Sequence, residues 1–291
     1  MESNQQALFT NGADGTRLFV RRRGGPSEVT AVLCDGIACD GFIWKYLWED
    51  LARTVSVAHW HYRGHGRSAP PTDPKRLDVV DHARDLEAVR AAIGDPPVVL
   101  VGHSMGCQVA LEAYRLRKEK ILGLVLICGS YGRVTHTFKG SNALAQLLPR
   151  LIERVEARPL FARAIWSRVP QEMTLRLALL SGEVASSIAP ADLMPYLKHV
   201  SDIDIPMFLK MLFAAGEHSA VDLLPQVDVP ALVIAGDKDT FTPARYAEEM
   251  AALLPRGELL MMPGGTHVAP LELKEAVLDR IEKFLHERVG V

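Results

Sequence analysis

The sequence has few cysteines, no long apolar run and no leader-like start. Its four cysteines, Cys34, Cys39, Cys107 and Cys128, form no CxxC pair. We therefore expect reduced, structural thiols in a cytoplasmic protein, not a disulfide scaffold. The longest clean apolar stretch, about residues 121–128, is far shorter than the roughly 18 residues of a membrane-spanning helix. No basic segment followed by an apolar one opens the chain, so we expect neither a signal peptide nor a membrane partner.

Charge of one sign is not concentrated either. The chain has 33 Lys and Arg against 35 Asp and Glu, with a net charge of −2, whereas nucleic-acid binding needs a basic face. We therefore expect no nucleic-acid partner. The one basic run, residues 21–23, is predicted to be the solvated edge of a hairpin. The 291 residues include 22 Gly and 18 Pro, scattered along the chain, so collagen-like and low-complexity classes are excluded and one or two globular domains are expected.

Strand and helix patterns alternate at both ends of the chain. Residues 7–20 read as a β-hairpin around the turn at 11–15, and the further predicted strands and helices follow from apolar periodicity. Strands are expected at 29–35, 55–61, 98–103, 122–127, 231–236 and 258–262, and helices at 43–52, 79–93, 105–117, 244–254 and 271–287.

Between these regions the alternation stops. Residues 131–225 contain only helical patterns, at 143–155, 160–166, 173–180 and 206–214. Strand–helix alternation predicts an α/β protein with a mostly parallel, doubly wound sheet flanked by helices. We expect residues 1–130 and 226–291 to form that core, and residues 131–225 to be an inserted helical cap above the strand ends.

A serine between glycines stands where a predicted strand turns into a predicted helix. The segment Gly102-His103-Ser104-Met105-Gly106 suits a tight, strained turn, because the glycines leave room where strand and helix backbones approach. Such a turn raises the serine hydroxyl above the sheet, at the start of the following helix. Ser104 is therefore the candidate nucleophile.

A serine nucleophile needs a general base and a group that orients this base. Asp237 and Asp239 follow the predicted strand at 231–236, and His267 follows the strand at 258–262. These positions lie just past the carboxyl ends of strands, where open α/β sheets place their sites. His267 is the candidate base, and either aspartate could be the acid.

These segments together resemble the α/β-hydrolase superfamily, in its serine esterase and lipase-like branch with a helical cap. The resemblance rests on GHSMG around Ser104, GDKDTFTP at the acid turn, GGTH ending at His267, and YRGHGRS at residues 62–68. It implies a catalytic triad of Ser104, Asp239 and His267, with Asp239 preferred over Asp237 because the family's acid ends a G-x-x-D turn.

The resemblance also implies an oxyanion hole made by the backbone N–H groups of Met105 and Ile37. The second position comes from the family's His-Gly pair after the third strand, but here Asp35 replaces the histidine. A carboxylate would oppose the charge of the oxyanion. We expect Asp35 to turn away from the substrate and to accept hydrogen bonds from its own loop and from residues 59–67, with Arg63 as a cation. Asp35 would then be structural.

The predicted function is hydrolysis of a carboxylic ester through an acyl-enzyme intermediate, without a cofactor. A lactonase, thioesterase, C–C bond hydrolase or cofactor-free perhydrolase could use the same triad, and a non-catalytic ligand-binding protein could share the fold. Ser104 argues against epoxide hydrolases and haloalkane dehalogenases, which need an aspartate at this position. His59 and His61 alternate on one strand, but no further ligand has matching spacing, so no metal site is expected.

The substrate is expected to be a small, apolar ester, because the predicted cap is rich in apolar side chains. Substrate-binding residues, acyl preference and oligomeric state stay open. The apolar cap residues considered for the pocket are Leu147, Leu148, Phe161, Ile165, Trp166, Met194, Met207, Phe208, Met211, Leu212 and Phe213.

Overall fold

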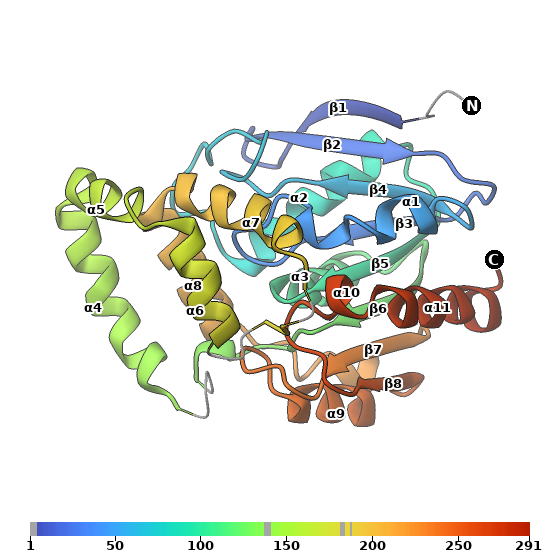
Figure 1. Cartoon of the computed structure of the whole chain (residues 1–291). Helices are drawn as coiled ribbons and strands as arrows, with labels where there is room; N and C mark the ends of the chain where they lie inside the picture. The colour runs from blue at the N-terminus through green and yellow to red at the C-terminus, as the bar shows by residue number, and fades with distance from the viewer. Residues whose placement is uncertain (1–4, 137–140, 181–183, 187) are drawn as a thin grey trace.

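An eight-stranded sheet forms the centre of the molecule (Figure 1). The computed structural model describes residues 5–136, 141–180, 184–186 and 188–291. The sheet order is β1-β2-β4-β3-β5-β6-β7-β8, with antiparallel pairing among β1, β2 and β4 and parallel pairing elsewhere. The predicted hairpin and mostly parallel sheet are thus confirmed. The strands are β1 (Gln5–Asn11), β2 (Arg17–Arg23), β3 (Thr30–Cys34), β4 (Ser56–Trp60), β5 (Val98–His103), β6 (Ile121–Ile127), β7 (Ala231–Gly236) and β8 (Gly257–Met262).

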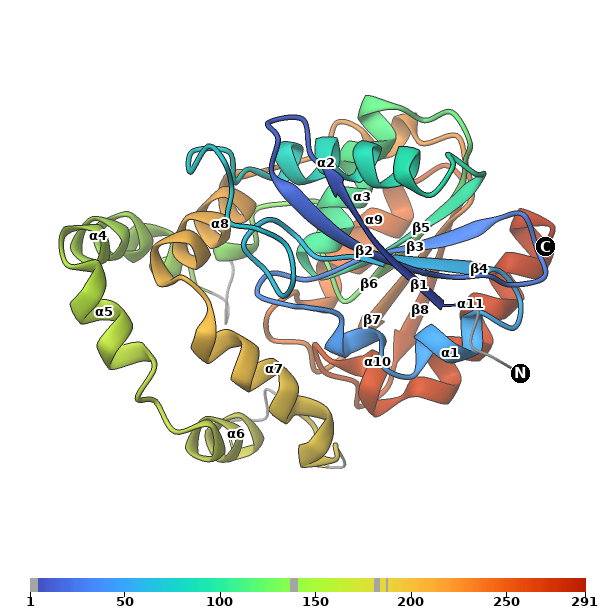
Figure 2. The ribbon, with the colours of Figure 1, turned by 90° about the horizontal axis from the view of Figure 1, so that it is seen from above.

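Helices cover both faces of the sheet (Figure 2). The central strands β3, β5 and β7 are buried along their whole length, because helices pack on both of their faces and their side chains are almost all apolar. Apolar residues form two buried clusters, one on each side of the sheet. One face carries α2 (Val79–Ala92), α3 (Met105–Leu116) and α9 (Ala244–Leu253), and the other α1 (Leu47–Leu51), α10 (Ala269–Glu272) and α11 (Lys274–Phe284).

The α-helices that the structure describes between β6 and β7 lie together at one side of the sheet (Figures 1 and 2). Among the described residues of this segment, the only β-pairing is an isolated bridge between Gly132 and Ser219. The helices are α4 (Ala143–Ala157), α5 (Pro159–Trp166), α6 (Gln171–Leu180), α7 (Pro190–Asp202) and α8 (Ile205–Glu217).

Helix α7 was not predicted from the sequence. Pro195 lies inside it, and proline in a helix interior is unfavourable by about 3 kcal/mol. Contacts with the core compensate for this local cost. Tyr196 stacks on Phe42 with ring centroids 4.6 Å apart, and the buried Asp192 accepts hydrogen bonds from Lys45 and Tyr46.

The prediction that residues 21–23 form a solvated edge is wrong. Strand β2 lies between β1 and β4, so it has a neighbour on each side. The Arg21 guanidinium lies 4.4 Å from the Trp48 ring, and its Nε donates to His59 Nδ1 over 3.1 Å. The net charge of the chain gives no information on the direction of a single side chain. It therefore could not show that Arg21 points toward the buried His59.

The four cysteines are all free and buried. Within the described ranges, no helix combines the length and the apolar character that crossing a bilayer requires.

Candidate active site

The candidate nucleophile lies on a strained turn between β5 and α3. Ser104 has φ 56° and ψ −121°, a conformation that costs free energy for a residue with a Cβ. Glycine is required on both sides. A Cβ at Gly102 would lie 2.4 Å from the carbonyl oxygen of Gly106, and a Cβ at Gly106 would lie 2.1 Å from that of Cys34. The GHSMG segment therefore forms the turn that its glycines predicted.

Three loops bring the predicted triad residues together. His267 Nε2 lies 3.0 Å from Ser104 Oγ, and His267 Nδ1 lies 2.9 Å from Asp239 Oδ2. The Asp239 side chain is fully buried, whereas His267 is 16% exposed. Because the aspartate accepts the proton of Nδ1, the lone pair of Nε2 faces the serine hydroxyl. This is the arrangement that general-base activation of a serine needs.

The acid turn holds Asp239 as a carboxylate. Its oxygens accept hydrogen bonds from the amides of Phe241 and Thr242 at 2.8 and 2.9 Å, and from Thr242 Oγ1 at 2.7 Å. Burial by itself would raise the pKa of Asp239, but its interactions with His267 and Thr242 outweigh burial and lower this pKa. The runner-up, Asp237, is exposed and instead accepts the Gly264 amide at 2.7 Å. Of the two aspartates, Asp239 is the one in contact with the histidine.

The two amides predicted as oxyanion donors belong to Ile37 and Met105. Within the described part of the chain, neither N–H group donates a hydrogen bond to another protein group. Both residues line the same cavity as Ser104 and His267. A Cβ at Gly36, next to Ile37, would lie 3.1 Å from Ser104 Cβ. Two free backbone donors are therefore placed on the lining of the nucleophile's cavity.

Asp35 is completely buried and points away from this cavity. Its carboxylate accepts hydrogen bonds from Trp44 Nε1 at 2.7 Å and from His59 Nε2 at 2.8 Å. The pKa of Asp35 is lowered, because its interactions with His59 and Trp44 outweigh the opposing effect of burial. The expected donor from residues 59–67 is thus present as His59, whereas the other donor is Trp44, which lies in the segment predicted as a helix and not in the loop after β3.

The expected cation is a different residue. Arg63 pairs with Asp85 and Asp14, at 2.7 and 3.0 Å. Arg21 instead reaches Asp35 indirectly, through His59. The prediction of Arg63 was wrong because sequence proximity to His59 does not give the direction of a side chain, whereas pairing of β2 with β4 places Arg21 opposite His59.

Three residues that support the site were not predicted. His103 donates from Nε2 to the carbonyl oxygen of His267 over 2.8 Å, which links the serine turn to the base loop. Glu272 accepts the amide and the hydroxyl of Thr266 at 2.9 and 2.7 Å. Thr242 contacts Asp239 as described above. Only His103 and Thr242 had a sequence signal, since both lie within motifs already singled out.

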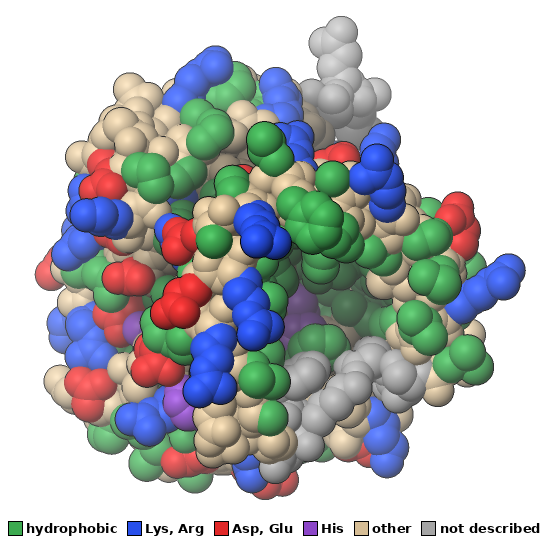
Figure 3. Space-filling view, turned by 90° about the vertical axis from the view of Figure 1, so that its left-hand side faces the viewer, with side chains coloured by type: hydrophobic (Ala, Val, Ile, Leu, Met, Phe, Trp, Pro, Cys, Tyr) green, Lys and Arg blue, Asp and Glu red, His purple; other side chains and the backbone are tan. Residues whose placement is uncertain are grey.

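The cavity above Ser104 has a volume of about 470 Å³ and a mainly apolar lining. A hollow with hydrophobic walls and a histidine at its floor is open to the side that carries the inserted helices (Figure 3). Of the apolar cap residues considered from the sequence, Phe208 and Leu212 line this cavity, but Leu147, Phe161 and Ile165 are exposed. The lining residues that come from the 131–225 segment are Val134, Thr135, Leu144, Thr174, Leu175, Ala178, Val184, Leu193, Tyr196, Leu197, Phe208, Leu212 and Ala215.

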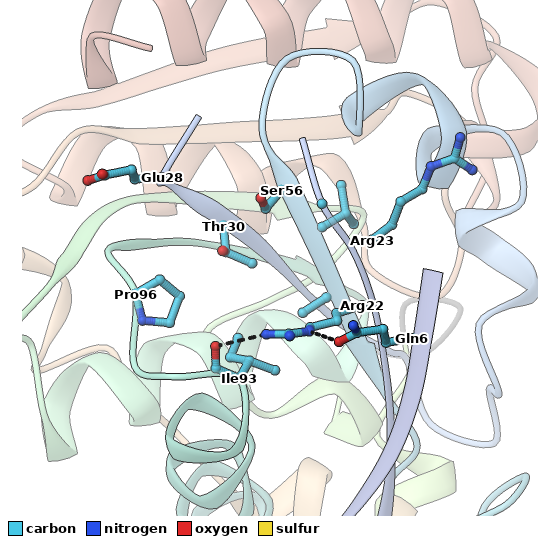
Figure 4. Close-up of a pocket in the computed structure, with 11 residues that line it drawn as sticks. Gln6, Arg22, Arg23, Glu28, Thr30, Ser56, Ile93 and Pro96 are labelled. Carbon is cyan, nitrogen blue, oxygen red and sulfur yellow. Dashed lines mark hydrogen bonds between the residues drawn. The ribbon is translucent and has the colours of Figure 1, made fainter. Parts of the chain in front are cut away.

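A second cavity, of about 320 Å³, lies at the opposite end of the parallel strands (Figure 4). Thr30 and Ser56, which begin β3 and β4, line it together with Arg22. Arg22 donates to Gln6 Oε1 and to the carbonyl oxygen of Ile93. This amino-terminal end of the strands is remote from Ser104, which follows the carboxyl end of β5.

His59 in β4 and His61 just after this strand both have hydrogen-bond partners in the protein. His59 contacts Asp35, and His61 Nδ1 accepts the Arg67 amide at 2.7 Å. Their rings do lie on one face, with centroids 5.3 Å apart. No group of three or more His, Cys, Asp or Glu with metal-holding geometry occurs among the residues that the structure describes.

Comparisons with known proteins agree with the fold and with a hydrolase. Over 267 residues the chain is 30% identical to a pimeloyl-[acyl-carrier protein] methyl ester esterase of Neisseria meningitidis, covering 91% of this chain and 96% of the relative. It is 27% identical over 277 residues to the polyketide synthase ThaQ of Burkholderia thailandensis, covering 94% of this chain but only 12% of that much longer protein.

A solved structure supports the fold independently. The esterase of Thermogutta terrifontis superposes with a TM-score of 0.76 at 22% identity, over 98% of this chain and all of the other. A family model described as alpha/beta hydrolase fold matches residues 32–272, which include the strained serine turn and the loops of Asp239 and His267. The chain therefore belongs to the α/β-hydrolase family and is a hydrolase.

Proposed function

We propose that this hydrolase cleaves carboxylic esters through a catalytic triad of Ser104, His267 and Asp239. The observation that carries the proposal is the continuous chain of contacts from Ser104 Oγ to His267 at 3.0 Å and from His267 to Asp239 at 2.9 Å. Esterases among the relatives and among the similar structures support this chemistry.

The reaction follows from the roles of these groups. Ser104 Oγ attacks the ester carbonyl carbon while His267 Nε2 takes the hydroxyl proton, and Asp239 stabilises the imidazolium that forms. His267 then gives this proton to the leaving alcohol. A water molecule, deprotonated by the same histidine, attacks the acyl-enzyme, and the free acid and Ser104 are released. All these steps use side chains of the protein, without a cofactor.

The N–H groups of Ile37 and Met105 form the oxyanion hole in this proposal. The carbonyl oxygen of the substrate becomes negatively charged when Ser104 attacks. Two backbone donors that make no other hydrogen bond in the described structure can stabilise that charge, and removing one such donor typically costs about 3–4 kcal/mol of transition-state stabilisation. Asp35 does not oppose this charge, because its carboxylate faces Trp44 and His59.

Residues 131–225 act in this proposal as the cap that shapes the substrate site. Cap and core residues together line the cavity of about 470 Å³, mainly with apolar groups. Such a lining favours a small apolar ester over a charged one, because a charged group would lose hydration without gaining a partner. The four buried, unpaired cysteines are consistent with a cytoplasmic protein.

The test is pre-steady-state turnover of a chromogenic short-chain ester. Wild-type protein should release a burst of chromophore equal to one site per chain, because the acyl-enzyme accumulates. Ser104→Ala should remove both the burst and the turnover while the thermal unfolding temperature stays close to that of wild type. Retention of more than a few per cent of the rate would disprove the mechanism. A parallel panel of esters, lactones and thioesters identifies the preferred acyl group.

A further inference from the structure

The Ile37 amide lies in a tight turn whose backbone conformation is unfavourable for the residues that form it. The Cys39 amide donates to the Gly36 carbonyl oxygen over 3.3 Å and closes a four-residue turn. Ala38, its third residue, has φ 57°. A positive φ at this position is typical of a type II turn, which normally has glycine there. With alanine the turn carries strain, so contacts from outside must hold it.

Two hydrogen bonds from one neighbouring segment hold the peptide groups on either side of the Ile37 amide. Tyr62 Oη donates to the carbonyl oxygen of Asp35 over 2.8 Å, which anchors the peptide group before Gly36. The Ala38 N–H donates to His65 Nε2 over 3.2 Å, which anchors the peptide group after Ile37. The peptide group that carries the Ile37 N–H lies between these two anchors.

The hydrogen bonds of His65 leave its Nε2 as an acceptor for the Ala38 amide. Its Nδ1–H donates to the carbonyl oxygen of Arg63 over 2.9 Å, so Nε2 keeps its lone pair for the Ala38 amide. The side chain is completely buried, and burial lowers its pKa to about 4. The ring is therefore neutral at physiological pH, and both of its nitrogens have partners.

We propose that the turn at residues 62–65 positions the oxyanion donor Ile37, with His65 as the main positioning residue and Tyr62 as the second. This inference rests on the proposed function, because it assigns a role within the proposed oxyanion hole. A small displacement of the Ile37 turn would change the position of the Ile37 N–H relative to Ser104. The turn at residues 36–39, which contains Ile37, packs directly on the nucleophile, since a Cβ at Gly36 would meet both Ser104 Cβ and His103 Nδ1, at 3.1 and 3.2 Å.

Two substitutions of His65 separate its two hydrogen bonds. In His65→Asn, the side-chain amide can still donate to Arg63, but no atom occupies the position of Nε2. In His65→Gln, the amide oxygen can take the place of Nε2 and accept the Ala38 N–H. Complete removal of an oxyanion donor costs about 10²–10³ in kcat. For a donor that is only loosened we expect kcat to fall about 10-fold in His65→Asn, with KM nearly unchanged, and less than about threefold in His65→Gln.

Replacing the carbonyl oxygen of the substrate by sulfur tests how well the oxyanion hole stabilises the charge on that atom. A thionoester places sulfur, a larger and weaker hydrogen-bond acceptor, where the ester places oxygen. If His65 positions Ile37, the ratio of ester to thionoester turnover falls in His65→Asn and is kept in His65→Gln. A residue that only stabilises the fold would lower both rates together. Unfolding temperatures of both variants are measured alongside.

Equal ester-to-thionoester ratios in wild type and His65→Asn would overturn the inference. Tyr62→Phe is the second test if His65→Asn does not fold, because it removes only the hydroxyl that anchors Asp35; its ratio should also fall. Failure of the proposed function can be distinguished from failure of this inference, because Ser104→Ala would keep its turnover if the proposed function were wrong. An inactive Ser104→Ala combined with unchanged ratios in both anchor variants refutes only the positioning role.

Discussion

Two of the Asp–His pairs among the described residues, Asp239–His267 and Asp35–His59, differ in what the second ring nitrogen of the histidine contacts. In Asp239–His267 and in Asp35–His59, a fully buried carboxylate contacts one nitrogen at 2.9 and 2.8 Å. The other nitrogen of His267 faces the Ser104 hydroxyl at 3.0 Å. The other nitrogen of His59 accepts from the guanidinium of Arg21 at 3.1 Å.

This difference shows that an Asp–His pair alone is not a general base. A base needs a lone pair directed at the group that loses a proton. The lone pair of His59 Nδ1 accepts a hydrogen bond from Arg21 Nε, so it is not available as a base. Arg21 also supplies positive charge near the Asp35 carboxylate. His59 is completely buried, whereas His267 is partly exposed in the cavity. We therefore interpret the first pair as catalytic and the second as structural.

The largest expected effect is on kcat, when the aspartate of the Asp239–His267 pair is replaced by the isosteric asparagine. Asp239→Asn should lower kcat about 10⁴-fold, because the amide favours the wrong histidine tautomer. Asp237→Asn is the matched control two residues away, and it should lower kcat far less, since the Asp237 carboxylate accepts the Gly264 amide and not a proton of His267. Steady-state rates on one chromogenic ester provide the comparison. Equal losses, or a larger loss in Asp237→Asn, would contradict the assignment.

An intermediate effect is expected when the second pair is changed. Asp35→Ala leaves Trp44 Nε1 and His59 Nε2 buried without an acceptor, so the free energy of unfolding should fall by about 1–3 kcal/mol. We expect kcat to fall about 10-fold through a less ordered Ile37 amide, still far from the 10³-fold loss of a missing oxyanion donor. Asp35→Asn should be milder in both, because its oxygen can still accept one bond.

Chemical denaturation and ester turnover measured on the same Asp35 preparations check this prediction. If Asp35→Asn were as inactive as Ser104→Ala with an unchanged unfolding temperature, Asp35 would be a proton-transfer group. The comparison between a catalytic and a structural pair would then fail.

The last prediction concerns pH. Burial lowers the pKa of His61 to about 3 and those of His65 and His103 to about 4, below the ordinary value of about 6.5. As the pH falls below about 6.5, the unfolded chain binds protons that the folded protein does not, so the free energy of unfolding decreases. Each such histidine contributes up to about 1.4 kcal/mol per pH unit until its folded pKa is reached.

Denaturation midpoints at pH 7.5, 6 and 5 measure this slope. His65→Gln cannot titrate in this range, and its slope should be shallower than that of wild type. An identical slope in the two proteins would mean that His65 is not a neutral buried acceptor, which would also weaken its assignment to the Ala38 amide.

Local chemistry explains why some parts of this protein were predictable and others were not. The strands and the serine turn follow from apolar periodicity and from glycines that neighbouring backbone atoms require, and these signals are present in adjacent residues. Helix α7 was not predicted, and the stacking of its Tyr196 on Phe42 involves a residue that lies far outside the sequence of the helix. The cap residues of the cavity were mostly missed for a related reason: an amphipathic pattern shows that one face is apolar, but not whether it meets the core, the cavity or solvent.

The sequence by itself determined the alternating architecture and the order of the residues Ser104, Asp239 and His267, because each depends on short-range patterns at strand ends. Only the tertiary structure decided which partners complete the second Asp–His pair. Arg21 reaches His59 because β2 pairs with β4, and Arg63 instead pairs with Asp85 from α2. Likewise, His65 holds the Ala38 amide across 27 residues of chain. Hydrogen bonds between distant segments depend on sheet register and side-chain direction, and neither is encoded in the residues next to each partner.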